Sequence, residues 1–194
     1  MITNINQLDL QKTYSYADYL TWKFDEQIEL FLGKIQRMSP APRTDHQRIS
    51  RKLTGVMIRC FNNNTCEFFI APFDVRLLDK NKSTSDAEVF TVVQPDLCVI
   101  CDPRQIDDKG AFGAPNLVVE ILSPGNSKKE MKIKFDLYQQ AGVTEYWIIN
   151  PENKSVLIYL LKDLIYVGQH PLVEDDAIQS FQFPTLKFNL DEIF

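Results

Sequence analysis

The sequence has few of the residues on which zinc sites and disulfide frameworks depend. It has two histidines, His46 and His170, without ligand spacing. Its four cysteines, Cys60, Cys66, Cys98 and Cys101, do not form the framework of a small secreted protein. Cys98 and Cys101 form a C-x-x-C, but residues three apart on a strand point to opposite faces, so we expect their thiols to diverge. The sequence therefore predicts neither a zinc site nor a redox pair.

Long apolar runs are absent as well. The longest, Leu117 to Leu122 and Val156 to Leu161, are too short to cross a bilayer. The first residues, MITNINQLDLQKTY, have neither the basic segment nor the apolar segment of a secretory signal. We therefore expect a cytoplasmic protein that does not contact membranes. No glycine-rich phosphate loop is found either.

The composition is that of a soluble globular protein, with 194 residues of which 44% are hydrophobic. This length predicts a single domain over residues 1–194, with residues 1–27 as an N-terminal helical elaboration. The net charge of −5 argues against a broadly basic nucleic-acid surface. Local basic clusters remain, in Lys128, Lys129, Lys132 and Lys134 and in Arg43, Arg48, Arg51, Lys52 and Arg59.

Hydrophobic periodicity predicts helices and strands that alternate along the chain. The expected helices are Ser15–Trp22, Asp45–Phe61 with a Thr44/Gln47 capping box, and Ser127–Ala141. The expected strands are a hairpin around Gly33 within Ile28–Met38, then Glu67–Ile70, Phe73–Leu78, Asp96–Cys101, Asn116–Leu122, Glu145–Asn150, Val156–Leu161 and Leu164–Gly168. Polar loops are expected at 79–88 and 102–114, and a docking segment at 186–194. This order indicates an α/β (α+β) domain with one central mixed β-sheet flanked by helices.

Two carboxylates stand where a carboxylate is costly. Glu120 lies inside the apolar run Leu117 to Leu122, which is typical of a strand buried on both faces. A charge there costs several kcal/mol unless it is paired or binds a metal. Asp96 opens a similar apolar strand. If the two strands are neighbours, alternation allows Asp96 and Glu120 to share one face.

A lysine accompanies them. On the helix expected at 127–141, the buried arc is defined by Met131, Phe135, Leu137, Tyr138 and Ala141. Lys134 falls near the middle of this arc, whereas the other lysines of the helix fall outside it. We therefore expect Lys134 to point toward the core, close to the end of the strand that carries Glu120.

Two acids and a lysine at strand ends suit metal-dependent hydrolysis of a phosphodiester. Carboxylates bind Mg²⁺ through oxygen, the metal polarises the phosphate and activates water, and the lysine orients that water or stabilises charge. The competing interpretation is a structural ion pair between Glu120 and Lys134. Asp96 weakens the ion-pair interpretation, because a pair between Glu120 and Lys134 does not explain a second acid without an evident cation.

These residues also carry a resemblance to a known family. Pro95-Asp96 with Glu120 on the next strand resembles the PD-(D/E)xK superfamily of restriction-endonuclease-like folds. More narrowly, the chain resembles the Uma-type ("Uma two") endonucleases that are common in bacteria. The matching segments include IELFLGKIQRMSPAP, VQPDLCVI, PNLVVEILSPGN and KFDLYQQAGVTEYWIINP.

The resemblance implies a central mixed sheet flanked by helices, an Mg²⁺ (or Mn²⁺) cofactor and a nucleic-acid partner, DNA in the first instance. Asp96 and Glu120 would be the metal ligands and Lys134 the catalytic lysine. Its usual position, two residues after the glutamate, holds Leu122 here. Glu29 matches an acidic position facing the site, with an exposed strand-end acid as the alternative. The family pattern ELIDGE reads ELFLGK here, so two acids are replaced.

Other polar residues receive weaker assignments. Asp74 matches an acid of the family, but Asp74 and Arg76 are expected on one exposed strand face. His46 is expected at the surface or as a capping group, and Ser123 as a turn residue. Rival functions are a catalytically silent module that binds nucleic acid or protein, and a hydrolase of small phosphodiesters. The resemblance also suggests a homodimer.

Overall fold

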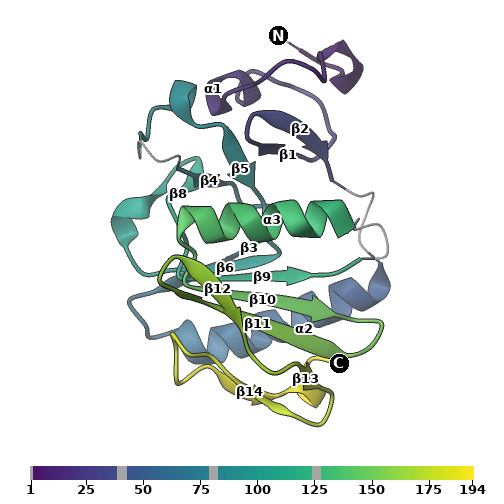
Figure 1. The fold of residues 1–194 in the computed structure, drawn as a ribbon, viewed down its shortest axis with the longest axis vertical. Helices are drawn as coiled ribbons and strands as arrows, with labels where there is room; N and C mark the ends of the chain where they lie inside the picture. The colour runs from purple at the N-terminus through teal and green to yellow at the C-terminus, as the bar shows by residue number, and fades with distance from the viewer. Residues whose placement is uncertain (1, 39–42, 79–82, 124–127) are drawn as a thin grey trace.

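A computed structural model of the chain describes residues 2–38, 43–78, 83–123 and 128–194 (Figure 1). It contains the α-helices α1 (Tyr16–Tyr19), α2 (Thr44–Phe61) and α3 (Lys128–Ala141). Short 3-10 helices are η1 (Ile5–Gln7), η2 (Asp86–Glu88), η3 (Pro103–Gln105) and η4 (Leu190–Glu192). In the described residues, no helix is both long and apolar enough to cross a bilayer.

The larger of the sheets, called the central sheet below, has the order β12-β11-β10-β9-β6-β3, with β13 beside β11. Its strands are β3 (Glu67–Ile70), β6 (Leu97–Ile100), β9 (Leu117–Ile121), β10 (Glu145–Asn150), β11 (Ser155–Lys162), β12 (Ile165–Gly168) and β13 (Leu172–Val173). Strands β9 and β10 run parallel, whereas β6 and β9 run antiparallel. The predicted mixed sheet, and the α+β class, are therefore confirmed.

Helices cover both faces of the central sheet. Alternate residues of its strands pack with α2 on one face, including Leu97, Leu117 and Val119. The intervening residues, such as Cys98 and Val118, pack with α3 on the other face. Figure 1 shows α3 running alongside β9 on one side of the sheet, and α2 passing behind β10 and β11 on the other. The burial of both faces explains why these strands read as continuous apolar runs.

A second sheet, called the N-terminal sheet below, corrects the expectation of one sheet. Its order is β2-β1-β5-β4-β8-β7. The strands are β1 (Ile28–Phe31), β2 (Lys34–Arg37), β4 (Val75–Leu77), β5 (Thr91–Val93), β7 (Ile106–Asp107) and β8 (Gly110–Phe112). Strand β5 was not expected, and β7 and β8 replace a predicted loop. Strands of two or three residues have too few positions to show alternation, so they are recognised only by their hydrogen-bonded pairing with other strands.

The N-terminal sheet and α3 share one hydrophobic cluster with the central sheet. This cluster joins Phe31 and Val93 of the N-terminal sheet to Cys98 of the central sheet and Leu137 of α3. Helix α3 therefore packs against both sheets, and a side chain on it can meet residues from either. The predicted hairpin around Gly33 forms, and it presents β1 to this interface.

Three local predictions need comment. The residue before α2 is Arg43, and no side chain caps the helix, so the predicted Thr44/Gln47 box is wrong. Ser15 and Asp18, by contrast, form a capping box at α1. The tail docks as expected, through β15 (Lys187–Asn189), which pairs with β14 (Ala177–Gln179), and through buried residues including Leu190 and Ile193.

The cysteines differ from expectation in one respect. Cys66 and Cys101 form a disulfide, which the sequence analysis did not predict. Cys98 and Cys101 diverge as expected, because Cys98 is buried on the α3 face while Cys101 packs on the α2 face. The antiparallel pairing of β3 with β6 brings Cys66 next to Cys101, and such pairing across the chain is invisible in local spacing.

Candidate active site

The expected acids meet at one end of the central sheet. Leu97 pairs with Val119 across β6 and β9. Continuing this register by one residue places Asp96 opposite Glu120, on the same face of the antiparallel pair. Both residues line a cavity of about 360 Å³, called the acidic cavity below. The predicted neighbouring strands are therefore confirmed.

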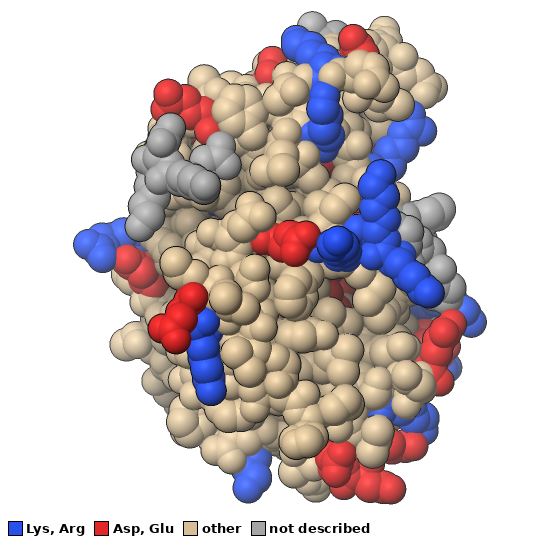
Figure 2. Space-filling view, viewed as in Figure 1, with Lys and Arg blue, Asp and Glu red and all other residues tan. Residues whose placement is uncertain are grey.

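Lys134 enters the acidic cavity from α3. Its side chain is 9% exposed, and its Nζ lies 3.0 Å from Glu120 Oε1. Its Nζ also lies 3.0 Å from Glu29 Oε1. The predicted inward orientation of Lys134 is confirmed, and Lys128, Lys129 and Lys132 are exposed as expected. Figure 2 shows basic side chains gathered over the end of α3 where the helix begins.

Glu29 reaches the same cavity from the N-terminal sheet. The residue is 1% exposed, so the alternative of an exposed strand-end acid is wrong. Its Oε1 accepts a hydrogen bond from the backbone N–H of Gln94, at 2.8 Å, in addition to its contact with Lys134. Helix α3 thus carries a lysine that bridges one carboxylate from each sheet.

The electrostatics of this cluster are unbalanced. The pKa of Glu120 is raised from 4.5 to about 7, chiefly by burial and also by the charges of Asp96 and Glu29, against the attraction of Lys134. Burial alone would lower the pKa of Lys134, but Glu120 and Glu29 outweigh it and hold this pKa well above its usual value. Tyr138 also donates to Glu120 Oε1 at 2.6 Å. Two carboxylates therefore share one lysine, and the charge of a third, Asp96, acts on Glu120.

Asp96 is held by His46, which was expected at the surface or as a capping group and is neither. His46 is 8% exposed, and its Nε2 lies 3.0 Å from Asp96 Oδ1. Asp96 Oδ2 accepts the backbone N–H of Ile121 at 2.7 Å. Burial lowers the pKa of His46, but the hydrogen bond and charge of Asp96 outweigh it, so the pKa is raised.

A signal for His46 was present in the sequence. His46, Ile49, Leu53 and Val56 follow the i, i+3, i+7, i+10 spacing of one buried helix face. This spacing, rather than the place of His46 in the first turn, indicates the burial that the structure shows.

Polar atoms in and near the acidic cavity are incompletely paired. Among the described residues, His46 Nδ1 and Gln94 Oε1 are the buried side-chain nitrogen and oxygen atoms without a hydrogen-bond partner. Both residues line the acidic cavity. Native proteins pair nearly all such atoms, so these two are consistent with a site that a bound group completes.

Asp74 and Arg76 do not behave as expected. Arg76 is 2% exposed and pairs with Asp107 at 2.6 Å, so the predicted exposed face is wrong. Asp74 accepts hydrogen bonds from Tyr16 and from Gln94. Gln94 lines the acidic cavity and Asp74 does not. Asp74 therefore lies outside the cavity and orients Gln94 through this hydrogen bond.

The donor set suits a hard divalent cation bound by few protein ligands. No group of three or more Asp, Glu, His or Cys residues in the described parts of the chain forms a ready-made metal cage. Mg²⁺ does not need such a cage, because one or two carboxylates with water and substrate phosphate oxygens suffice. Asp96 and Glu120 are two carboxylates on one cavity wall, within an excess of buried negative charge that a cation would offset.

Comparison with solved structures defines the class of fold. The chain superposes on the crystal structure of a "putative nuclease" from Anabaena variabilis ATCC 29413 with a TM-score of 0.69. The match covers 93% of this chain and 97% of that one, at 19% sequence identity. The protein therefore has the fold of this nuclease-like structure.

Sequence comparison then gives the family. The Uma2 family model, described as "Putative restriction endonuclease", matches residues 16–191, and the chain belongs to this family. A relative in Synechocystis sp., an uncharacterized protein, is 26% identical over 152 residues, which are 77% of this chain and 75% of that protein. The resemblance drawn from the sequence is confirmed, and the family supports a nuclease-type function.

Proposed function

We propose that the protein is a metal-dependent endonuclease that hydrolyses phosphodiester bonds in nucleic acid, DNA in the first instance. The observation that carries this proposal is the acidic cavity, which Glu29, Asp96, Glu120 and Lys134 line together, with Lys134 paired to both glutamates. Such an excess of buried carboxylates over cations is costly for folding, which is a common sign of a functional site. Formation of a homodimer stays a prediction.

Asp96 and Glu120 are the proposed ligands of Mg²⁺ or Mn²⁺. When bound, the metal would polarise the phosphate and lower the pKa of a water molecule. His46 and the N–H of Ile121 each hold one oxygen of Asp96, so this carboxylate is fixed in direction before any ligand arrives. Preorganised ligands lower the reorganisation that binding requires.

Lys134 is the proposed positioning and charge-stabilising group. Its raised pKa keeps the amine protonated at neutral pH, so it donates hydrogen bonds and cannot accept a proton. We therefore assign it to orienting the attacking water and stabilising charge on the phosphate, rather than to deprotonating the water. Glu29 holds the lysine from the second sheet, at 3.0 Å.

The test is a cleavage assay on single-stranded DNA, duplex DNA and RNA, with Mg²⁺, Mn²⁺ or chelator. We expect metal-dependent cleavage that Glu120→Gln abolishes, because it removes a proposed ligand. Glu67→Gln is the matched control, since Glu67 is exposed and pairs with the far end of β6. Nucleic-acid binding with no cleavage in any condition would favour the catalytically silent module instead.

A further inference from the structure

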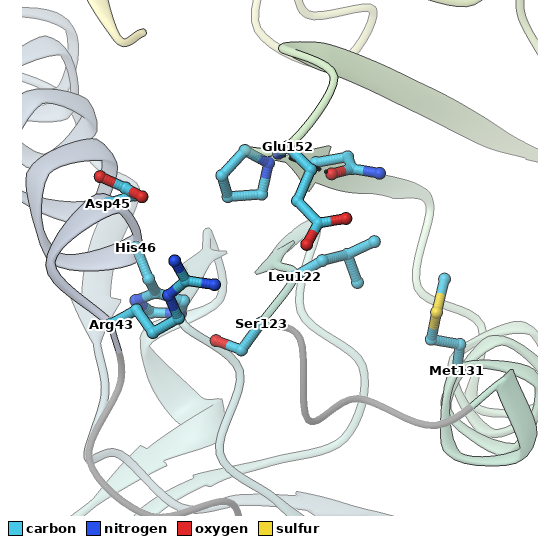
Figure 3. Close-up of a pocket in the computed structure, with 9 residues that line it drawn as sticks. Arg43, Asp45, His46, Leu122, Ser123, Met131 and Glu152 are labelled. Carbon is cyan, nitrogen blue, oxygen red and sulfur yellow. Dashed lines mark hydrogen bonds between the residues drawn. The ribbon is translucent and has the colours of Figure 1, made fainter.

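A second cavity, of about 450 Å³, adjoins the acidic cavity. The two share His46 and Ser123 in their walls. The described residues that line this second cavity are Arg43, Asp45, His46, Leu122, Ser123, Met131, Asn150, Pro151 and Glu152 (Figure 3). It will be called the side cavity. Its size is within the range of pockets that bind small organic groups.

The walls of the side cavity have different chemistries. Leu122, at the end of β9, and Met131, on α3, contribute apolar surface, and both are only partly buried. Asn150 and Glu152, in the turn after β10, contribute an amide and a carboxylate. Figure 3 shows the Glu152 carboxylate reaching into the cavity from this turn, with Arg43 and Ser123 on the opposite side.

The turn itself orients the polar groups. Asn150 Oδ1 accepts the backbone N–H of Glu152 at 2.9 Å, so the amide nitrogen is the group that Asn150 can still offer as a donor. The Glu152 carboxylate is a pure acceptor when ionised. A donor therefore stands beside an acceptor, above an apolar wall. This combination matches the edge and the face of a nucleobase.

We propose that the side cavity binds one unpaired nucleobase of the nucleic-acid strand, with guanine preferred. This inference rests on the proposed nuclease function, because the strand would lie with its scissile phosphate in the acidic cavity. Because His46 and Ser123 line both cavities, a single nucleic-acid strand can place its scissile phosphate in the acidic cavity and a neighbouring base in the side cavity. Arg43, exposed at the rim, is placed to contact a flanking phosphate.

Guanine is preferred for a geometric reason. It alone offers two adjacent N–H groups, at N1 and N2, that can engage both oxygens of a carboxylate. Its neighbouring O6 can accept from the Asn150 amide. Adenine has no carbonyl oxygen for this amide, and hypoxanthine lacks the N2 amine.

Glu152 also determines which form of nucleic acid fits. A carboxylate repels phosphates, so the Glu152 side chain favours the N–H groups of a base over the strand's phosphate backbone. In a duplex these groups are already paired, so the base must be unpaired or flipped to enter. Asp45, the other acid of the rim, is engaged with Arg48 at 3.5 Å.

Binding of mononucleotides tests the cavity without any need for cleavage. GMP and IMP are titrated into the full-length protein in chelator, followed by calorimetry. We expect GMP to bind about tenfold more tightly than IMP, because IMP lacks one N–H to the carboxylate. Glu152→Gln should remove this difference, and Glu67→Gln should keep it. Equal binding of GMP and IMP by the wild type would overturn the guanine preference, and no binding of either would overturn the nucleobase site.

A cleavage assay distinguishes failure of the nucleobase site from failure of the proposed nuclease function. Single-stranded DNA carrying one guanine is compared with the same strand carrying hypoxanthine, and with its duplex. We expect faster cleavage beside guanine and slower cleavage of the duplex, with the guanine preference lost in Glu152→Gln. Asn150→Asp keeps the oxygen that accepts from Glu152 N–H but removes the donor to O6, so it should slow cleavage beside both bases, which share O6, and keep the preference for guanine. Cleavage without any preference would overturn the inference alone. If nothing is cleaved while GMP still binds selectively, the nuclease proposal fails and the nucleobase site stands.

Discussion

Two glutamates of the central sheet are buried in opposite ways. Glu145, at the start of β10, is 0% exposed, and Glu120, near the end of the neighbouring β9, has a side chain 12% exposed. Glu145 accepts from neutral donors alone, namely the Trp147 indole at 2.7 Å, the Ser180 hydroxyl at 2.8 Å, and the backbone N–H groups of Phe181 and Gln182. Glu120 instead shares Lys134 with another carboxylate and faces a third.

The difference separates a structural acid from a candidate functional one. Glu145 is satisfied by groups that the fold itself supplies, and three of its four donors, on Ser180, Phe181 and Gln182, belong to the C-terminal part of the chain. Glu120 lies among like charges, which repel it and raise its pKa to about 7. Burial of a carboxylate therefore does not by itself indicate function. A surplus of negative charge around it does.

The largest expected effect concerns Lys134. Lys134→Ala should lower the rate of nucleic-acid cleavage by about 10³-fold, because a preorganised charge next to the phosphate is lost. Lys132→Ala is the matched control, since Lys132 is exposed on the same helix. Rates are measured at saturating Mg²⁺. Wild-type turnover from Lys134→Ala would rule out the role assigned to Lys134. Glu120 would then be a structural acid, as Glu145 is.

The second effect tests Glu145. Glu145→Ala should lower the free energy of unfolding by about 3 kcal/mol or more, because two buried and two partly buried donors lose their acceptor. It should leave the response to Mg²⁺ intact, as followed by denaturant unfolding with and without the metal. A stable Glu145→Ala protein would show that these hydrogen bonds do not anchor the C-terminal segment.

The third effect is the dependence of stability on pH in chelator. The pKa of Glu120 is higher in the folded protein, at about 7, than the ordinary 4.5, so the folded state binds more protons. This contribution is fully present below pH 4.5 and is lost as pH rises through 7, by about 3 kcal/mol. Glu120→Gln should flatten this fall, whereas Glu145→Gln should not. His46, whose pKa is also raised, contributes in the same direction in both variants.

The fourth effect is stabilisation by metal at neutral pH. Mg²⁺ or Mn²⁺ at about one hundred times its Kd should stabilise the wild type by about 2.7 kcal/mol, through mass action. The gain should be absent in Glu120→Gln and present in Glu145→Gln. Because Glu29 still pairs with Lys134, Glu120→Gln should not leave the lysine unpaired. If neither metal changes the melting temperature of the wild type, the proposal that Asp96 and Glu120 are metal ligands is wrong.

The part of the site that was predictable lies on regular elements. Glu120 stood out inside an apolar strand, Asp96 opened another, and Lys134 fell on a buried helical arc. In each case a charged residue lies at a position that the surrounding apolar pattern predicts to be buried, and a sequence window of about ten residues is enough to show it. Local periodicity specifies which face a side chain occupies, so the three could be singled out before their neighbours were known.

The rest of the site depends on contacts between distant segments. The resemblance placed Glu29 near the site, but its contact with Lys134 exists because β1 belongs to a second sheet that packs against α3. His46 reaches Asp96 because α2 covers the other face of the central sheet. Local spacing indicates that His46 is buried, but it does not indicate either of these partners. The short strands β5, β7 and β8 that complete the second sheet were not predicted, because pairing with distant segments defines them.

The sequence alone determined the class of fold, the family, and the identity of one buried lysine and two buried acids. These follow from hydrophobic periodicity and from motifs, which are properties of short segments. Tertiary structure decided that Glu29 and His46 complete the acidic cavity, that Arg76 is buried, and that Glu145 is satisfied without a cation. The physical reason is that the electrostatic state of a buried charge depends on its partners in space, and those partners are set by the packing of whole sheets and helices.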